Sequence, residues 1–193
     1  MKKFLVAAVM AIFAVGANAQ VWVGGAAGFG FKNAKHNGNE RKLTEFVISP
    51  EIGYGIDEKW DVAIAFSSEY SKFKGHKSRN FFGFNPYARY TFATTGKVGF
   101  FLDGGFNLKV GDGIYTQGDD MTDVQDATEW GLSIQPGVKF AASDKITLVA
   151  KLGGLGYQHI QGDDMDCGGK LKSSEFGLNV DNYNIKLGIY YAF

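Results

Sequence analysis

Two unlike kinds of side chain alternate at every second position of this sequence, and that pattern constrains the fold more than any other feature. Between positions 98 and 110, one parity carries large apolar residues and the other carries mainly glycine, asparagine and charged residues. The large apolar positions are Val98, Phe100, Leu102, Phe106, Leu108 and Val110. A period of two is typical of a β-strand whose two faces meet different surroundings. Because no segment after residue 20 shows a sustained helical period, the sequence predicts an all-β protein.

The alternation recurs in eight segments, which we expect to be strands. They lie near 20–32, 44–56, 60–73, 80–93, 97–110, 129–141, 145–159 and 175–193. Short turns such as Asp57-Glu58-Lys59 join some of them. The other connections, at 33–43, 74–79, 111–128 and 160–174, are generally longer and more polar. Connections that alternate in length predict an antiparallel up-and-down meander.

Side-chain size indicates which face lies inside. The large apolar face carries Phe46, Ile48, Ile52, Tyr54, Val62, Ile64, Phe66, Phe82, Phe84, Tyr90, Phe92, Phe100, Phe106, Trp130, Leu132 and Ile134. The opposite face is rich in Gly28, Gly30, Gly53, Ala63, Ala65, Gly83, Gly99, Gly105, Gly131, Gly137, Gly153 and Gly188. The interior of an eight-stranded barrel is just wide enough for side chains to fill. Bulky residues would overfill it, so we expect them to face outward into a membrane.

The N-terminal segment has the features of a secretory signal peptide. Two lysines precede an apolar run that ends in the A-x-A cleavage site Ala17-Asn18-Ala19. We expect residues 1–19 to be cleaved on export and residues 20–193 to form one barrel domain. Loss of two of the 20 basic side chains with the leader leaves 18 against 20 acidic ones, a net charge of about −2. This balance does not favour a nucleic-acid partner.

All three prolines occur in one local pattern: apolar residue, polar residue, proline, then apolar residues at alternate positions. The three stretches are ISPEIGY at 48–54, FNPYARY at 84–90 and IQPGVKF at 134–140. Proline cannot donate to a strand ladder, so it is rare in strand interiors. By parity all three face the lipid, about seven or eight residues before a short turn. We expect them toward the headgroup level, with a bulge as a possible accommodation, and we favour an architectural role over a ligand-binding one.

Nine charged residues fall on the glycine-rich face. The acids are Glu51, Asp61, Glu69 and Asp103, and the bases are Arg89, Lys109, Lys139, Lys151 and Lys186. Because buried charges require partners, we predict an ion-pair network in the lumen, centred on Arg89. It would act as a selectivity filter or gate, or as a plug that fixes the packing. The narrow lumen favours the plug, and Tyr87 and Phe101 are also expected to point inward.

The C-terminal segment alternates from Tyr183 to Phe193 and ends on an aromatic residue. With the export signal and the eight strands, it resembles the small outer-membrane β-barrels of the OmpA/OmpX/OmpW type. The proline hairpins resemble the β-barrel domain common in the Bacteroidetes group. The resemblance implies an integral protein of the cell outer membrane, with short periplasmic turns and long outer loops. It also implies that the assembly machinery reads the last strand, including Tyr191 and Phe193.

The expected loops differ in charge. The first two supply candidate ligands for lipopolysaccharide phosphates: Lys35, Arg41, Lys42, Lys74, Lys77 and Arg79. The last two share the pentapeptide QGDDM and supply weak candidates for a divalent cation: Asp119, Asp120, Asp163 and Asp164. Alternatively the loops are merely soluble, or the basic and acidic loops attract one another. The absence of a complete calcium-loop motif favours this second reading.

Neither G-x-S-x-G nor H-E-x-x-H occurs in the sequence, and we predict no enzymatic activity and no cofactor. A hydrolase would have to use a loop pair such as His76 with Ser78, or His159 near Asp163. For Cys167, the single cysteine, oxidation or dimer formation is the expected chemistry. We predict a monomeric outer-membrane barrel with a charge-paired, largely plugged lumen. Its loops would contact lipopolysaccharide, host surfaces or partner proteins. A narrow porin-like channel for small or hydrophobic solutes is the alternative.

Overall fold

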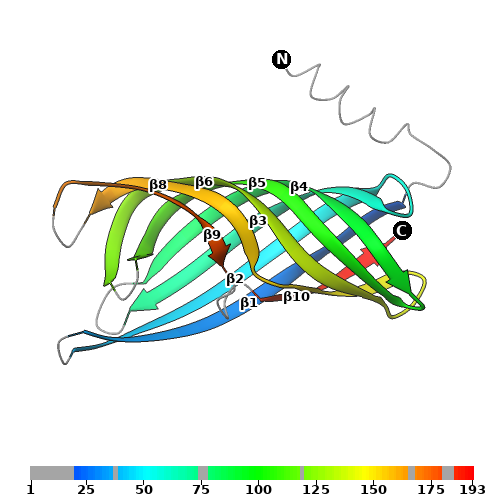
Figure 1. Ribbon diagram of the computed structural model, residues 1–193, viewed down its shortest axis with the longest axis horizontal. Helices are drawn as coiled ribbons and strands as arrows, with labels where there is room; N and C mark the ends of the chain where they lie inside the picture. Colours follow the sequence, from blue (N-terminus) through cyan, green and yellow to red (C-terminus); the bar gives the residue numbers. More distant parts are fainter. Residues whose placement is uncertain (1–19, 37–38, 74–77, 118–119, 165–167, 180–184) are drawn as a thin grey trace, which may run out of the picture.

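The computed structural model describes residues 20–36, 39–73, 78–117, 120–164, 168–179 and 185–193 (Figure 1). The expected leader at 1–19 lies outside these ranges. The strands are β1 (Gln20–His36), β2 (Asn39–Gly55), β3 (Trp60–Phe73), β4 (Arg79–Thr95), β5 (Val98–Gln117), β6 (Asp120–Ala141), β7 (Ile146–Lys151), β8 (Gly154–Asp164), β9 (Lys170–Asn179) and β10 (Lys186–Ala192). None of the described residues is helical, so none belongs to a helix long and apolar enough to cross a membrane.

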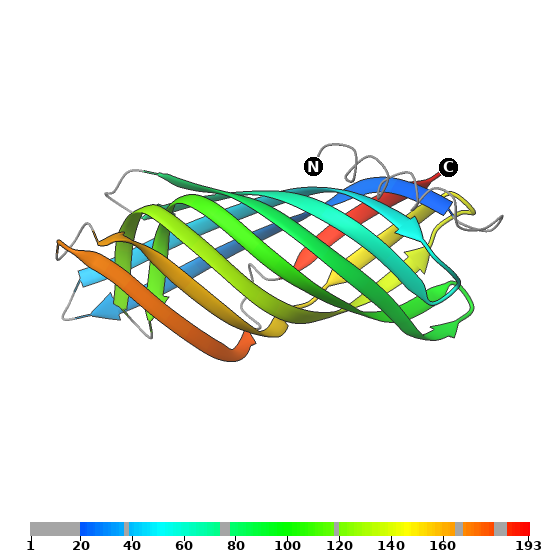
Figure 2. The same cartoon turned by 90° about the horizontal axis from the view of Figure 1, so that it is seen from above.

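The strands form an antiparallel barrel with eight strand positions (Figures 1 and 2). β1 to β6 pair in chain order, β6 pairs with β7, β7 with β10, and β10 with β1. Further along the barrel, β8 takes the place of β7 beside β6, and β9 pairs with β8. The predicted eight-stranded up-and-down barrel is confirmed. Its seventh and eighth positions each consist of two segments, however, and not of the continuous strands predicted at 145–159 and 175–193.

Much of the sequence predicted as loops is paired strand. β1 and β2 pair out to His36 and Asn39, and β5 and β6 pair out to Gln117 and Asp120. The prediction of loops at 33–43 and 111–128 is therefore wrong over most of their length. These stretches are mostly polar and show no sustained alternation, yet backbone pairing continues where the hairpins extend past the apolar wall. We call the end of the barrel where these hairpins extend the hairpin end. The opposite end, which carries the short turns, is the turn end.

Each proline leaves a gap in the ladder to the strand that follows it. Pro50 pairs with Gly25 of β1, but the β2–β3 ladder has no pair between Ile48–Ser68 and Glu51–Ala65. The β4–β5 ladder is interrupted in the same way beside Pro86. The register is unchanged across both gaps, so these two prolines are accommodated without the bulge that we considered.

Pro136 has a larger effect, because it lies where the seventh strand position breaks. β6 pairs with β7 up to Gly137–Lys151, and its pairing with β8 resumes at Ile134–Leu155 in a register shifted by one residue. Leu152 still donates its backbone N–H to the Pro136 carbonyl at 2.9 Å. The missing proline N–H thus coincides with a bulge that divides β7 from β8.

Polar side chains close two of the short turns. Asp57 Oδ1 accepts the backbone N–H groups two and three residues later, at 2.7 and 2.8 Å. Ser143 Oγ accepts the corresponding N–H groups after β6, at 3.3 and 3.1 Å. The third turn contains Gly96 at a φ of 57°, which glycine adopts without strain. Local hydrogen bonds of this kind explain why two or three polar residues suffice to reverse the chain.

The large apolar residues face outward, as predicted. Phe66 is 53% exposed and Leu132 is 57% exposed, whereas Ala63, Ala65 and other residues of opposite parity are buried. Tyr54 differs: it has the outward parity but is only 8% exposed. It lines an apolar groove in the outer wall, which is described below.

Glycines on the inner face make room for aromatic rings that also point inward. A Cβ atom on Gly53 would meet the indole ring of Trp22, and one on Gly137 would meet the ring of Phe101. Tyr190 occupies the space beside Gly24 in the same way. The rings of Trp22 and Tyr190 lie 4.4 Å apart, and Phe101 is fully buried. The lumen is therefore filled by aromatic rings packed on glycine backbone.

Replacing Gly137 by leucine is expected to destabilise the barrel, because the new side chain would claim the space of the Phe101 ring. Overpacking of this kind costs about 1–3 kcal/mol. Urea unfolding in lipid vesicles would measure the loss. Gly104→Ala is the matched control, since a Cβ at Gly104 meets no atom within 4 Å. Equal unfolding midpoints for the two variants would contradict this packing.

Candidate functional site

The interior of the barrel contains the residues that could carry a function. Glu51 on β2, Arg89 on β4, Asp103 on β5 and Lys151 on β7 are all buried there. Each belongs to the inward parity of its strand. The alternation that turns phenylalanine toward lipid therefore also turns these charges toward one another.

Arg89 and Asp103 form a two-pronged ion pair between neighbouring strands. Arg89 Nε donates to Asp103 Oδ1 at 2.7 Å, and Nη2 donates to Oδ2 at 2.8 Å. The two residues are register partners in the β4–β5 ladder. A planar guanidinium that meets a carboxylate with two parallel hydrogen bonds is the most directional ion pair that proteins form.

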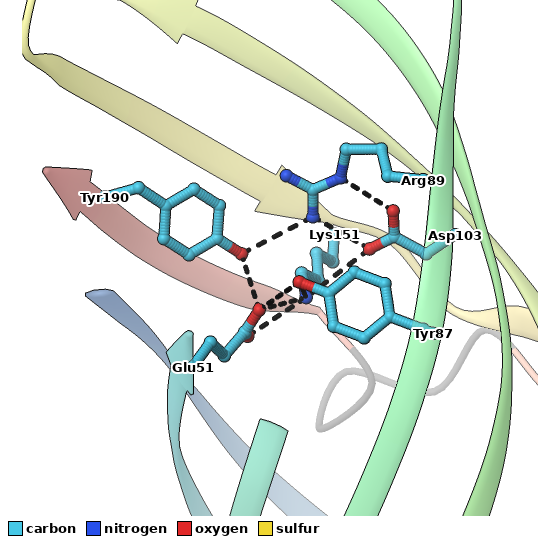
Figure 3. Close-up of polar contacts among 6 residues, drawn as sticks. All are labelled: Glu51, Tyr87, Arg89, Asp103, Lys151 and Tyr190. Atoms are coloured by element: carbon cyan, nitrogen blue, oxygen red, sulfur yellow. Dashed lines mark hydrogen bonds and ion pairs between the residues drawn. The ribbon is translucent and has the colours of Figure 1, made fainter. Parts of the chain in front are cut away.

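Lys151 connects this pair to Glu51 on the other side of the lumen (Figure 3). Its Nζ lies 3.0 Å from both carboxylate oxygens of Glu51 and 3.4 Å from Asp103 Oδ2. The hydroxyls of Tyr190, at 2.9 Å, and of Tyr87 also donate to Glu51. We call these six residues, Glu51, Tyr87, Arg89, Asp103, Lys151 and Tyr190, the lower cluster.

Aromatic rings surround the guanidinium of Arg89. Its Cζ lies 3.9 Å from the centre of the Phe101 ring and 5.3 Å from that of Tyr190. Such contacts stabilise a cation that has lost its water. The lower cluster and the aromatic filling are thus one packed unit.

A second group of charges lies nearer the hairpin end, and we call its members, Glu69, Lys109 and Glu129, the upper cluster. Lys109 Nζ is 3.1 Å from Glu69 and 3.0 Å from Glu129. Glu129, the first residue of the strand predicted at 129–141, is buried but was not among the predicted lumen residues. Its parity with Gly131 could have identified it. Adding Glu129 to the nine predicted charges gives a set of five acids and five bases.

The remaining predicted lumen residues lie apart from these ion pairs. Among the described residues, the ion pairs shorter than 4.0 Å do not include Asp61, Lys139 or Lys186. Asp61 interacts with the charge of Lys139 near the turn end, and Lys186 interacts with that of Glu69. The structure therefore arranges the predicted network as two clusters, with Asp61, Lys139 and Lys186 beside them.

The predicted surface residues are only partly described. Lys35, Arg41, Lys42 and Arg79 lie on paired strands, and the Lys42 side chain is exposed. Lys74, Lys77, Asp119 and Cys167 lie outside the described residues. Asp120 begins β6, whereas Asp163 and Asp164 lie near the end of β8. Within the described part of the chain, no three His, Cys, Asp or Glu side chains are grouped closely enough to hold a metal ion.

The predicted assembly signal lies at the turn end, where the ring closes. Tyr191 is a lipid-facing residue of β10, and its ring meets that of Phe193 edge-on at 5.3 Å. The Phe193 backbone N–H donates to the carbonyl of Val21 on β1 at 3.1 Å. The last residue of the chain is therefore attached to the first strand.

Arg89→Met should cost the barrel about 3–5 kcal/mol, because it leaves Asp103 buried without its two-pronged partner. The double variant Arg89→Met/Asp103→Leu should lose less, since Lys151 keeps Glu51 as its partner. Urea unfolding of Arg89→Met, Asp103→Leu and the double variant gives the coupling, and Lys97→Gln on an exposed turn is the control. If the double variant lost as much as the sum of the two single variants, no coupling would exist.

Comparisons with known proteins agree with this architecture. The structure resembles Neisserial surface protein A, with a TM-score of 0.51 and 17% identity over 91% of this chain and 99% of that one. It also resembles the outer membrane protein OprG from Pseudomonas aeruginosa, with a TM-score of 0.52 and 14% identity over 91% and 95% of the two chains. A search of curated proteins found no match. The family described as outer membrane protein beta-barrel domain matches residues 4–193, so the chain belongs to this family and is a protein of the cell outer membrane.

Proposed function

We propose that the protein is a plugged outer-membrane barrel whose hairpins serve as an interaction surface. The observation that carries this proposal is the filling of the lumen by the lower cluster together with Phe101, which has no exposed surface. Ions that cross a pore need a continuous wet path. Side chains from β2, β4, β5, β7 and β10 interrupt such a path within one layer.

The energetics of the lower cluster support a plug. A buried charge costs several kcal/mol unless it is paired and hydrogen-bonded, and each charge of this cluster has both kinds of partner. Opening a path would separate Lys151 or Arg89 from a carboxylate inside the lumen. A second barrier lies toward the hairpin end, where Phe81, Val124, Ala127 and Ile160 form a buried apolar group.

A narrow channel is the second candidate. Charged residues line the lumen at several levels, and Lys186 lies apart from the ion pairs among the described residues. A conducting state would require the lower cluster to change its pairing. We rank this function second because all the charges of that cluster are paired to one another in the structure.

Planar-bilayer recordings distinguish the two candidates. The wild-type protein should give no stable openings, whereas Arg89→Ala/Phe101→Ala should give steady conductance because it removes the centre of the plug. Phe106→Ala, which removes a ring of the same size from the outer wall, is the control. Heat-modifiable gel migration would verify that each variant is folded. Steady conductance of the wild-type protein would favour the channel.

We further propose that the hairpin end faces the cell exterior and that its basic residues bind lipopolysaccharide phosphates or an acidic partner surface. Lysine and arginine near an anionic surface each contribute about 1 kcal/mol. Lys35→Gln/Arg41→Gln/Lys42→Gln should therefore weaken binding to lipopolysaccharide vesicles at least tenfold, as measured by co-sedimentation of folded protein. Lys59→Gln/Lys97→Gln/Lys145→Gln at the turn end is the matched control. Equal binding by both triple variants would argue against the proposal.

We propose no catalytic role for the lumen or for the hairpins. In the described ranges, the charges of the lower cluster are paired with one another. The hydroxyl of Ser174, which lies beside the His159 imidazole, faces outward from the barrel.

A further inference from the structure

Three polar side chains form a cluster on the lipid-facing surface of β8 and β9. Tyr157 and His159 lie two residues apart on β8, and Ser174 is the register partner of His159 on β9. Ser174 Oγ is 2.7 Å from His159 Nδ1, and it accepts a hydrogen bond from the Tyr157 hydroxyl at 3.1 Å. The ring of Trp130 packs against both Tyr157 and His159, at 5.5 and 5.6 Å. We call Tyr157, His159 and Ser174 the polar triad.

The polar triad retains one hydrogen-bond donor for an outside molecule, whichever tautomer His159 adopts. If Ser174 donates to Nδ1, the imidazole carries its proton on Nε2. If Nδ1 instead donates to Ser174, the serine hydroxyl hydrogen remains available. Among the described residues, no other hydrogen bond is made by either side chain. A donor held at a lipid-facing surface can bind the carbonyl oxygen of an acyl ester.

A cation lies beside the polar triad on the side of the hairpin end. Lys172 is two residues from Ser174 on β9, so it shares the same face, and it pairs in register with Gln161. The next lysine, Lys170, is the register partner of the acidic residue Asp163. Lys172 is exposed, in a position suited to an anionic headgroup.

An apolar groove begins on the other side of the polar triad. It has a volume of about 1150 Å³, larger than a typical small-molecule pocket of ~300–1,000 Å³. Tyr157 and Phe176 line its end on β8 and β9, and the groove continues past Ile134 and Gly104 to Tyr54 on β2. Gly104 has open space above it.

From these three features we propose that the outer wall binds a single molecule of a phosphorylated acyl lipid. One acyl chain lies in the groove, its ester carbonyl meets the polar triad, and its phosphate meets Lys172. The order of apolar groove, neutral donor and cation along β8–β9 matches the order of chain, ester and phosphate in such a lipid. The site is separate from the lumen and from the basic hairpin residues, so it does not depend on the proposed function.

Native mass spectrometry of the folded full-length barrel, with dioleoylphosphatidic acid as the probe, tests the site. One lipid should bind before any others, and dioleoylglycerol, which lacks the phosphate, should bind at least fivefold less. Lys172→Gln should reduce the singly bound fraction at least fivefold. Gly104→Phe should do the same, because the new side chain would enter the groove and its Cβ meets no atom within 4 Å. Lys97→Gln and Leu187→Phe, a lipid-facing residue outside the groove, are the matched controls.

Ser174→Ala/His159→Leu should also reduce binding, and heat-modifiable migration would show that it is folded. If that variant misfolds, Lys172→Gln and Gly104→Phe still decide the question. Binding of many lipids without a first saturable one, or equal binding by the site and control variants, would overturn the proposal. Equal binding of the lipid with and without phosphate would overturn it as well.

Discussion

Hydrocarbon offers no partner to a backbone N–H or C=O group, and this constraint governs the whole barrel. Each unpaired group costs several kcal/mol in lipid, so the apolar wall must pair its strands on both edges. The contact between β10 and β1, which runs from Trp22–Ala192 to Gly28–Lys186, closes the ring at the turn end and attaches the last residue, Phe193, to Val21. Among the described residues, the ladder of β9 is with β8 alone. Once the ring is closed, the alternation of side chains along each strand determines which residues face lipid and which face the lumen. Residues of one parity contact acyl chains, and residues of the other parity must fill a narrow lumen.

The lumen contains glycines, aromatic rings and charged side chains, and these groups pack against one another. Trp22 and Phe101 occupy space that glycine backbone leaves open, and the rings then surround Arg89. The lower cluster is thus desolvated by the same packing that fills the barrel. A buried network of this kind contributes little net stability compared with an apolar core, but it disfavours every arrangement that leaves a charge unpaired. This is consistent with its position between strands that are distant in sequence, since β2 and β7 meet there through Glu51 and Lys151.

The sequence predicted the fold class, the outward face and nine inward charges, because all of these follow from a period of two. The prediction from sequence failed in the segments that show no two-residue alternation of apolar and polar side chains. The hairpin extensions are mostly polar and show no sustained alternation, so β1 beyond Lys32 was predicted to be a loop. Glu129, the first residue of the strand predicted at 129–141, was not recognised as an inward charge. The contact of His159 with Ser174 depends on the β8–β9 register, which side-chain patterns in two polar strands do not specify.

The three proline gaps all fall within hairpins joined by short turns, whereas the ladders on the other side of each proline strand continue past it. The proline-containing part of the wall therefore consists of two-strand hairpins. Each hairpin has a gap in its own ladder, whereas the ladder that joins it to the neighbouring hairpin continues past the proline. Such a wall bends most easily at regular intervals around its circumference. Flexing at these gaps would let the wall follow changes in bilayer thickness without breaking the ladders that join one hairpin to the next.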